Sequence, residues 1–218
     1  MFRRIRIVGK GRVGSAIAGR LASRGLTAET DPDLVLICVP DTAIADVARS
    51  VAAGPWVAHV SGATPLTALD PHARRFSLHP LQTFVRWRGP EQLEGAYAAV
   101  SFDDDDGRTR GWWLAETLGV RPFDLPEDHR PLYHAGAVMA SNYLVTLHRA
   151  ASRALESAGV PAEALIPLML RTIENHFELT GPIARGDWTT VEAHLKALEA
   201  DLPDLLPLYR ELARVTER

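Results

Sequence analysis

The sequence predicts an α/β fold in which a mainly parallel sheet is covered by helices and followed by an all-α C-terminal domain. Short apolar runs alternate with amphipathic stretches in the first part of the chain, a pattern typical of parallel sheets with helical crossovers. A glycine-spaced loop follows the first of these runs. Only helical periodicity remains after residue 126, so we place a sheet domain at residues 1–126 and a helical domain at residues 127–218.

Apolar periodicity and turn residues place the individual elements. The expected strands are short and rich in valine, isoleucine and leucine. In the second domain, proline- and glycine-containing turns separate long helical stretches. We expect strands at 5–8, 34–39, 56–60, 75–79, 96–102 and 120–123. We expect an amphipathic helix that includes Val13 and ends near Gly25, a helix that starts after Pro40, and further helices at 109–118, 133–158, 162–179, 189–200 and 205–216.

Gly9, Gly11 and Gly14 follow the first strand in the spacing that turns a strand onto a helix beneath a dinucleotide pyrophosphate. Gly9 allows the turn, Gly11 lets the backbone approach phosphate oxygens, and Gly14 lets helix and strand pack closely. The free N–H groups at the helix start, around Arg12 and Val13, can bind an anion. A strand before the motif and an amphipathic helix after it favour a site for NAD or NADP over an unrelated glycine-rich turn.

The segment after the first helix is too short for a complete dinucleotide-binding half. Only residues 26–33 separate that helix from the next strand, whereas a parallel neighbour needs a crossover of about a dozen residues or more. One strand–helix unit is therefore expected to be shortened or deleted. Glu29, Asp31 or Asp33 could still bind the adenosine ribose, but turn and N-cap chemistry explains Asp31-Pro32-Asp33 equally well.

Composition narrows the classes of partner. A net charge of −3 gives no general attraction to nucleic acid or to an anionic membrane, so we expect a small-molecule substrate. No apolar run approaches the roughly 18 residues of a membrane-spanning helix, and the chain enters its first strand at once. We therefore expect a cytoplasmic protein. The single cysteine, Cys38, lies in an apolar strand and is expected to be a buried hydrophobe rather than a reactive thiol.

Candidate site residues lie in loops that follow strands, because open α/β sheets bind ligands beyond the carboxyl ends of their strands. Val39 and Pro40 either contact the cofactor or simply lead into a capped helix. Ser61 and Gly62 offer a hydroxyl and unobstructed N–H groups beside a nicotinamide, or else form a plain turn. These loops should open onto the same edge as Gly9.

His79 is the candidate for proton transfer, because an imidazole of near-neutral pKa can pass a proton to a carbonyl or imine. The alternative is a histidine that is hydrogen-bonded within the loop around Pro80. His134 and Asn142, on the first long helix of the second domain, are its candidate partners; the small residues between them leave room for a ligand or for close helix packing. No metal site is expected, because the acidic run at 103–106 precedes a helix and is better explained as a cap.

Several segments together resemble a family with a Rossmann-like oxidoreductase domain and a C-terminal domain of unknown function, related to pyrroline-5-carboxylate reductase and the 6-phosphogluconate dehydrogenase-like enzymes. The resemblance covers almost the full length. It implies an NAD(P)-binding fold, a helical domain that forms a homodimer, and a cleft between them; the His-Pro pair also looks like the catalytic loop of prephenate dehydrogenases. The segments that carry it are 9–14, 34–41, 60–63, 77–84, 133–144 and 179–187.

Two departures limit what the resemblance implies. The shortened second-strand region leaves adenosine recognition and the choice between NAD and NADP open. The lysine that β-hydroxyacid dehydrogenases carry shortly before a helix asparagine is absent, since Val138 and Met139 stand there before Asn142. The sequence thus favours an NAD(P)-dependent oxidoreductase acting on a small carbonyl or imine. The alternative is a non-catalytic ligand-binding or dimeric interaction protein on a degenerate scaffold.

Overall fold

The structure is a computed structural model that describes residues 1–217. It divides into two compact units, Met1–Val138 and the chain from Met139 onward. The sequence-based boundary falls at residues 126/127, where the helical part of the chain begins; in the structure, helix α4 (Arg130–Val138) groups with the sheet. Each unit is described separately.

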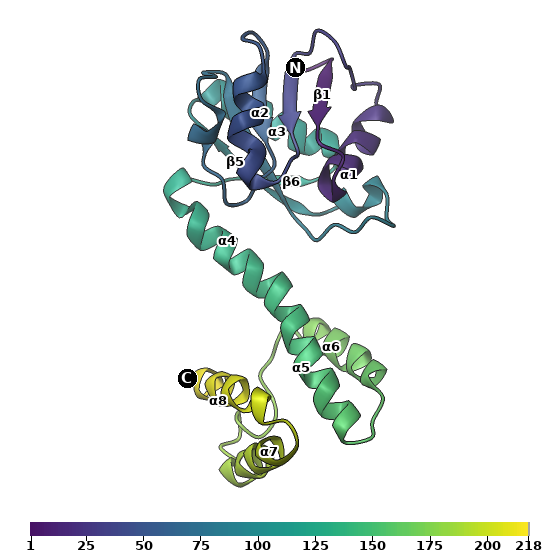
Figure 1. Ribbon diagram of the computed structural model, residues 1–218, viewed down its shortest axis with the longest axis vertical. Coiled ribbons are helices and arrows are strands. Elements are labelled where there is room, and N and C mark those ends of the chain that lie inside the picture. Colours follow the sequence, from purple (N-terminus) through teal and green to yellow (C-terminus); the bar gives the residue numbers. More distant parts are fainter. Residues whose placement is uncertain (218) are drawn as a thin grey trace. The chain divides into compact units, whose positions relative to one another are not determined.

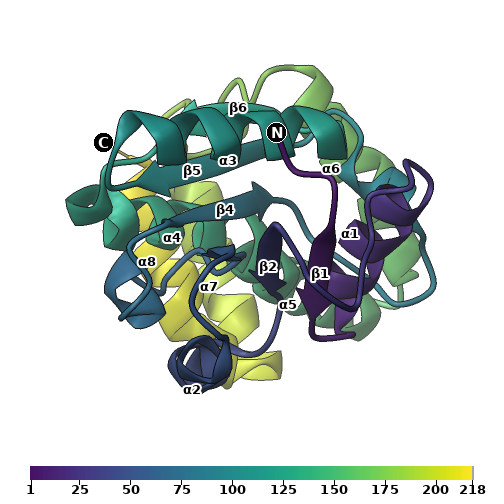
Figure 2. The same cartoon turned by 90° about the horizontal axis from the view of Figure 1, so that it is seen from above.

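The first unit is built on a six-stranded sheet whose spatial order is also the sequence order, β1 to β6 (Figures 1 and 2). β1 to β4 run parallel, β5 is antiparallel to β4, and β6 is parallel to β5, so the predicted mainly parallel sheet is confirmed. The strands are β1 (Ile5–Val8), β2 (Leu34–Ile37), β3 (Trp56–His59), β4 (Arg75–Leu81), β5 (Tyr97–Phe102) and β6 (Arg121–Asp124).

Helices cover both faces of this sheet, which explains why β2 is apolar at every position. Leu34 and Leu36 pack in the cluster that includes helices α1 (Arg12–Ala22) and α3 (Asp105–Leu118). Val35 and Ile37 pack on the other face in the cluster that includes α2 (Ile44–Ser50). Figure 2 shows α2 and α3 on opposite sides of the strands.

Cys38 and the acidic run behave as the sequence predicts. Cys38 is buried, and burial raises the pKa of its thiol to about 12. Asp104 is the N-cap of α3 and accepts a hydrogen bond from the backbone N–H of Gly107 at 2.7 Å. Within residues 1–217, no group of His, Cys, Asp and Glu side chains is arranged to hold a metal ion.

The free edge of β1 shows that the expected strand–helix unit is shortened. After α1, the chain touches this edge through a single bridge between Ile5 and Thr27 and then crosses directly to β2. The second strand of a full dinucleotide-binding half is thus reduced to one bridge. β1 therefore stands at the edge of the sheet, where the usual fold would place further strands.

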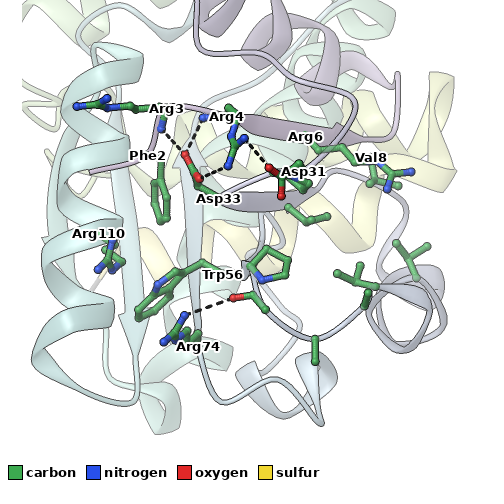
Figure 3. A pocket seen from close by; sticks show the side chains of 18 of the residues that line it. Phe2, Arg3, Arg4, Arg6, Val8, Asp31, Asp33, Trp56, Arg74 and Arg110 are labelled. Atoms are coloured by element: carbon green, nitrogen blue, oxygen red, sulfur yellow. Dashed lines mark hydrogen bonds and ion pairs between the residues drawn. The ribbon is translucent and has the colours of Figure 1, made fainter.

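Asp31 and Asp33 lie at the wrong end of the sheet to bind a ribose. The Asp33 carboxylate accepts hydrogen bonds from the backbone N–H groups of Arg3 and Arg4, at 2.8 and 2.9 Å, and these bonds lower its pKa. Asp31 pairs with the Arg4 guanidinium at 2.6 Å (Figure 3). Both carboxylates hold the amino ends of β1 and β2, opposite the glycine loop. Of the three acidic candidates, only Glu29, which is exposed beyond the Thr27 bridge, is not placed at that end.

The second unit consists of helices, as expected. A π-helical turn at Met139–Tyr143 leads into α5 (Leu144–Ser157), followed by α6 (Leu165–Glu174), α7 (Trp188–Asp201) and α8 (Leu206–Thr216). Asp187 caps α7 by accepting the backbone N–H of Thr190 at 3.1 Å. Among the described residues, no helix is long and apolar enough to span a bilayer.

Candidate active site

The glycine loop has the geometry that a pyrophosphate needs. A Cβ added at Gly9, whose φ is +113°, would lie 2.4 Å from the carbonyl oxygen of Cys38, and a Cβ at Gly14 would lie 2.2 Å from the oxygen of Gly9. Gly11 has no other heavy atom within 4 Å of that position, so its surroundings are open. Gly11 is also the N-cap of α1, and no side chain caps the helix there. The first N–H groups of α1 are therefore available to an anion.

The predicted loops do meet at one edge of the sheet. The strand register aligns Val8, Ile37, His59 and Ser77 across β1 to β4. Lys10, Val39, Ser61 and His79 each stand two residues further along. Because these strands are parallel, the four positions lie in sequence along the carboxyl edge, with the glycine loop at one end and His79 at the other.

Gly62, His79 and His134 converge at this edge. A Cβ added at Gly62 would lie 2.8 Å from Cε1 and 2.9 Å from Nε2 of His79, and 2.9 Å from Cδ2 of His134. The two imidazole rings are 6.3 Å apart between centroids. The lack of a side chain at Gly62 therefore lets two imidazoles approach the same backbone segment. Asn142, the third candidate, belongs to the second unit, so its place at the site stays a prediction.

His79 lies within a strand, whereas the sequence predicts that the strand ends there. β4 continues to Leu81, and His79 pairs with Ala99 of β5. The ladder between β4 and β3 ends at Ser77, so β4 extends past β3 beside the site. Pro80, which has no N–H to donate, is tolerated because the strand has no partner on that side.

Tyr133 is the direct partner of His79. Its hydroxyl oxygen is 2.7 Å from His79 Nδ1, and the rings meet edge to face. Burial, followed by the charges of His134 and Arg130, lowers the pKa of His79 to about 4, while burial raises the pKa of Tyr133 to about 12. The expectation of a near-neutral imidazole pKa is therefore wrong. At neutral pH His79 carries one ring proton and Tyr133 keeps its hydroxyl proton.

Arg130 links the Ser61 turn to β4 by hydrogen bonds, and it was not among the residues predicted from sequence. Its side chain is 2% exposed, and its guanidinium donates to the carbonyl oxygen of Ser61 at 3.1 Å and to Ser77 Oγ at 2.7 Å. Its charge is balanced by Glu127, whose other carboxylate oxygen accepts the backbone N–H of Leu66 at 2.9 Å. The only sequence signal was the charged run that opens the helical part of the chain, at residues 127–130.

Ser61 forms a hydrogen-bonded turn, and a contact from this turn to a cofactor stays a prediction. Its hydroxyl accepts the backbone N–H groups of Ala63 and Thr64, at 3.2 and 3.0 Å. Its own N–H donates to Nδ1 of His59, a completely buried histidine. Burial, then the charge of Arg130, lowers the pKa of His59 to about 3. The turn is thus rigid and presents Gly62 at its tip.

Val39 and Pro40 continue β2 into the next helix. The Val39 side chain packs against the apolar cluster under α2. The Pro40 carbonyl accepts the N–H of Ala43 and so opens a short 3-10 turn at Asp41–Ala43. Asp41 is close enough to His79 to oppose the lowering of its pKa. A contact from this segment to a cofactor stays a prediction.

A cavity of about 960 Å³ lies at the opposite edge, among the arginines and the two aspartates at the amino ends of β1 to β3 (Figure 3). Its size alone would suggest a binding site. However, it contains neither the glycine loop nor any of the histidines described above, and ligands of such sheets bind at the carboxyl edge. We therefore assign the candidate active site to the Gly62–His79–His134 cluster.

Comparison with solved structures gives the same fold. A candidate NADP oxidoreductase from Bacteroides fragilis superposes with a TM-score of 0.83 at 22% identity, covering 99% of this chain and 98% of that one. Protein TM1727 from Thermotoga maritima gives a TM-score of 0.78 at 24% identity, with 97% and 96% covered. Pyrroline-5-carboxylate reductase from Streptococcus pyogenes gives 0.64 at 16% identity, with 98% of each chain covered.

These similarities show a Rossmann-like fold, as the sequence predicts, and at such identities they show the fold alone. The search of curated proteins found no match. The family model described as a domain of unknown function, DUF2520, matches residues 97–216, which is more than half of the chain. The chain therefore belongs to the DUF2520 family.

Proposed function

We propose that the protein is an NAD(P)H-dependent oxidoreductase that acts on a small carbonyl or imine. The observation that carries this proposal is the meeting of Gly62, His79 and His134 on the same strand edge as an open, uncapped glycine loop. Gly9, Gly11 and Gly14, with the N–H groups around Arg12 and Val13, would hold the pyrophosphate. Ser61 and Gly62 would border the nicotinamide. A bound cofactor of this kind supplies a hydride, and the protein supplies position and proton control.

His79 would act as a neutral donor rather than as an imidazolium. In this proposal the neutral Tyr133 O–H donates to Nδ1, which places the ring proton on Nε2, an atom 2.9 Å from a Cβ built on Gly62. Nε2–H would bind the carbonyl oxygen or imine nitrogen of the substrate and pass its proton there as the new hydroxyl or amine forms. Tyr133 would pass its proton to Nδ1 as Nε2 loses its own; water then reprotonates Nε2, and Nδ1 returns its proton to Tyr133. His134 would bind the substrate.

Of the two nicotinamide dinucleotides, NADP fits the loop better. A cofactor with a free ribose hydroxyl is usually recognised by an acid at the end of the second strand. Asp31 and Asp33 are tied to the N-terminal backbone at the other end of the sheet. Lys10 and Arg12, in contrast, flank Gly11 and would attract an additional phosphate.

The second unit supports a homodimer. Apolar side chains of α6 are left uncovered: Ile166 is 49% exposed, Leu168 62%, Leu170 55% and Ile173 49%. Ile166, Leu170 and Ile173 share one face of α6, and an exposed apolar face of this kind marks an interface. A second copy of the chain would cover it, as the family resemblance implies. Sedimentation of the full chain, with Leu170→Glu as the disrupting variant, tests this.

Titration with NADH and NADPH, followed by calorimetry and by thermal shift, tests the cofactor. Micromolar binding supports an enzyme, whereas no binding at millimolar concentration supports the non-catalytic ligand-binding alternative, for which the shortened adenosine side is the specific reason. For catalysis, His79→Ala should abolish turnover of a substrate found by screening while leaving cofactor affinity nearly unchanged. Unchanged turnover would remove His79 from the mechanism.

A further inference from the structure

The shortened second strand leaves the adenosine side of the glycine loop without its usual wall. What lies beside that loop instead is the connection between β4 and β5, residues 82–96, which runs past α1 (Figure 1). Pro90 of this connection stands against Gly19, with 3.3 Å from its Cγ to a Cβ built on the glycine, and its carbonyl oxygen accepts a hydrogen bond from Arg20. Arg20 also pairs with Glu94 at 2.9 Å. The connection is therefore fastened along the helix that the glycine loop begins.

Basic side chains from both segments line one hollow. Lys10 and Arg12 of the glycine loop face Arg86 and Arg88 of the connection across a space of about 190 Å³, which Gly11 also lines. In residues 1–217, no carboxylate forms an ion pair with any of these four side chains, although acidic residues outnumber basic ones in the whole chain. Grouping like charges without a counter-charge is unfavourable, so the hollow is suited to a multiply charged anion.

A buried glutamine holds the connection in place. Gln92 is 8% exposed; its Oε1 accepts the N–H of Val85 at 2.8 Å, and its Nε2 donates to the carbonyl oxygens of Arg88 and Gly89, both at 3.0 Å. One side chain thus fixes the backbone from Val85 to Gly89. Arg86 and Arg88 are therefore presented by an ordered backbone, which reduces the entropy lost when a ligand binds.

Trp87 stands between these two arginines and is 77% exposed. The Arg88 guanidinium lies 4.8 Å from the centre of its ring. Trp87 and Arg88 also line a second hollow of about 250 Å³, which shares Val85 with the first. An uncovered indole beside a cationic hollow offers a flat surface to an aromatic base, and such stacking contributes about 1–3 kcal/mol per base in nucleic-acid complexes.

We propose that the β4–β5 connection replaces the missing strand–helix unit as the adenosine-binding wall. In this arrangement Lys10, Arg12, Arg86 and Arg88 bind the 2′-phosphate of NADP, and Trp87 stacks on the adenine. This inference rests on the proposed function, because it assumes that the glycine loop holds the pyrophosphate. It assigns to residues far along the chain a task that the second strand usually performs.

The test uses fragments of the cofactor that lack the nicotinamide, so that the experiment measures binding and not turnover. Calorimetry on the full chain compares 2′,5′-ADP with 5′-AMP, which differs from it only in lacking the 2′-phosphate. A charge-assisted hydrogen bond is worth about one factor of ten or more in affinity, so wild type should prefer 2′,5′-ADP by about 100-fold. Arg86→Ser combined with Arg88→Ser should remove most of that preference. Arg24→Ser, an exposed arginine beyond the far end of α1, is the matched control and should leave it unchanged.

Trp87 is tested separately. Trp87→Leu should weaken both fragments equally, by about tenfold, and Trp87→Phe should restore most of the affinity. Binding should also quench tryptophan fluorescence in wild type and much less in Trp87→Phe. These side chains are exposed, so we expect each variant to fold. The melting temperature of each variant checks this.

The outcomes separate this inference from the proposed function. If wild type binds NADPH but does not distinguish the two fragments, or if the arginine double variant keeps the preference, the adenosine wall is wrong and the cofactor assignment stands. If only Trp87→Leu has no effect, the adenine contact is wrong. If neither NADH nor NADPH binds wild type, the proposed function itself fails, and this inference fails with it.

Discussion

Acidification should destabilise the sheet unit through His59, which is buried, and His79, which is partly buried. His59 and His79 have pKa values lowered from 6.5 to about 3 and about 4, because burial and nearby positive charge disfavour the imidazolium. Below pH 6.5 the unfolded chain binds a proton at each histidine, whereas the folded chain does not. Stability is therefore fully present above the unfolded pKa and is lost as the pH falls toward the folded pKa.

The expected loss is large relative to the stability of a domain. Between pH 8 and pH 5, each histidine lowers the free energy of unfolding by about 2 kcal/mol, since one pKa unit corresponds to about 1.4 kcal/mol. Together they account for about 4 kcal/mol, compared with roughly 5–15 kcal/mol for a typical native protein. Near pH 5, each histidine makes the free energy of unfolding fall by about 1.2 kcal/mol for each pH unit of acidification.

Urea unfolding of the full chain at pH 8, 7, 6 and 5, followed by tryptophan fluorescence, measures this slope. His79→Gln and His59→Gln each remove one titrating group, so each should flatten the pH dependence by about 1 kcal/mol per pH unit, whatever the variant does to stability at pH 8. The exposed His129→Gln is the control variant. If His79→Gln and His59→Gln unfold with the wild-type slope between pH 6 and 5, the two histidines are not held neutral and the electrostatic description of the site is wrong.

Four further predictions test separate parts of the molecule. Gly11→Asp should lower NADPH affinity about 100-fold while the melting temperature holds or rises, because aspartate is a good N-cap but repels phosphate; unchanged affinity in calorimetry would contradict the loop assignment. Tyr133→Phe should reduce kcat roughly 100-fold, measured by steady-state kinetics, with little change in cofactor affinity. A variant that retains the wild-type kcat would contradict the proposed proton path. Gly62→Ala should impair turnover without unfolding the protein, since the new methyl group would press on both imidazoles; full activity would show that the rings do not need this approach. Leu170→Glu with Ile173→Glu should shift the sedimenting species from dimer to monomer, and a wild-type chain that sediments as a monomer would contradict the proposed dimer.

The glycine loop and the strands could be predicted because they depend on neighbouring residues. Gly9 needs a positive φ and Gly14 needs close packing whatever the rest of the chain does. Counting residues 26–33 was enough to predict the shortened unit, because chain length limits what a crossover can contain. The rule that parallel strands end at a common edge placed Gly62 and His79 together.

The remaining features depend on contacts between residues distant in sequence. Tyr133 stands 54 residues from His79, and Arg130 stands 53 from Ser77, so no local pattern could pair them. Nor could a pattern reveal that burial lowers the pKa of His79, since the shift depends on everything packed around the ring.

The class of fold, the glycine turn and the residue types at the strand ends follow from the amino-acid sequence, because backbone geometry and periodicity are local properties. The hydrogen bond between His79 and Tyr133, and the bonds from Asp33 to the N-terminal backbone, become apparent only once the chain is folded. The same holds for the return of the loop carrying Arg86 and Arg88 to the glycine loop. These outcomes are set by how distant loops fold back on one another, and loop sequences constrain that far less than strand and helix sequences constrain their own conformation.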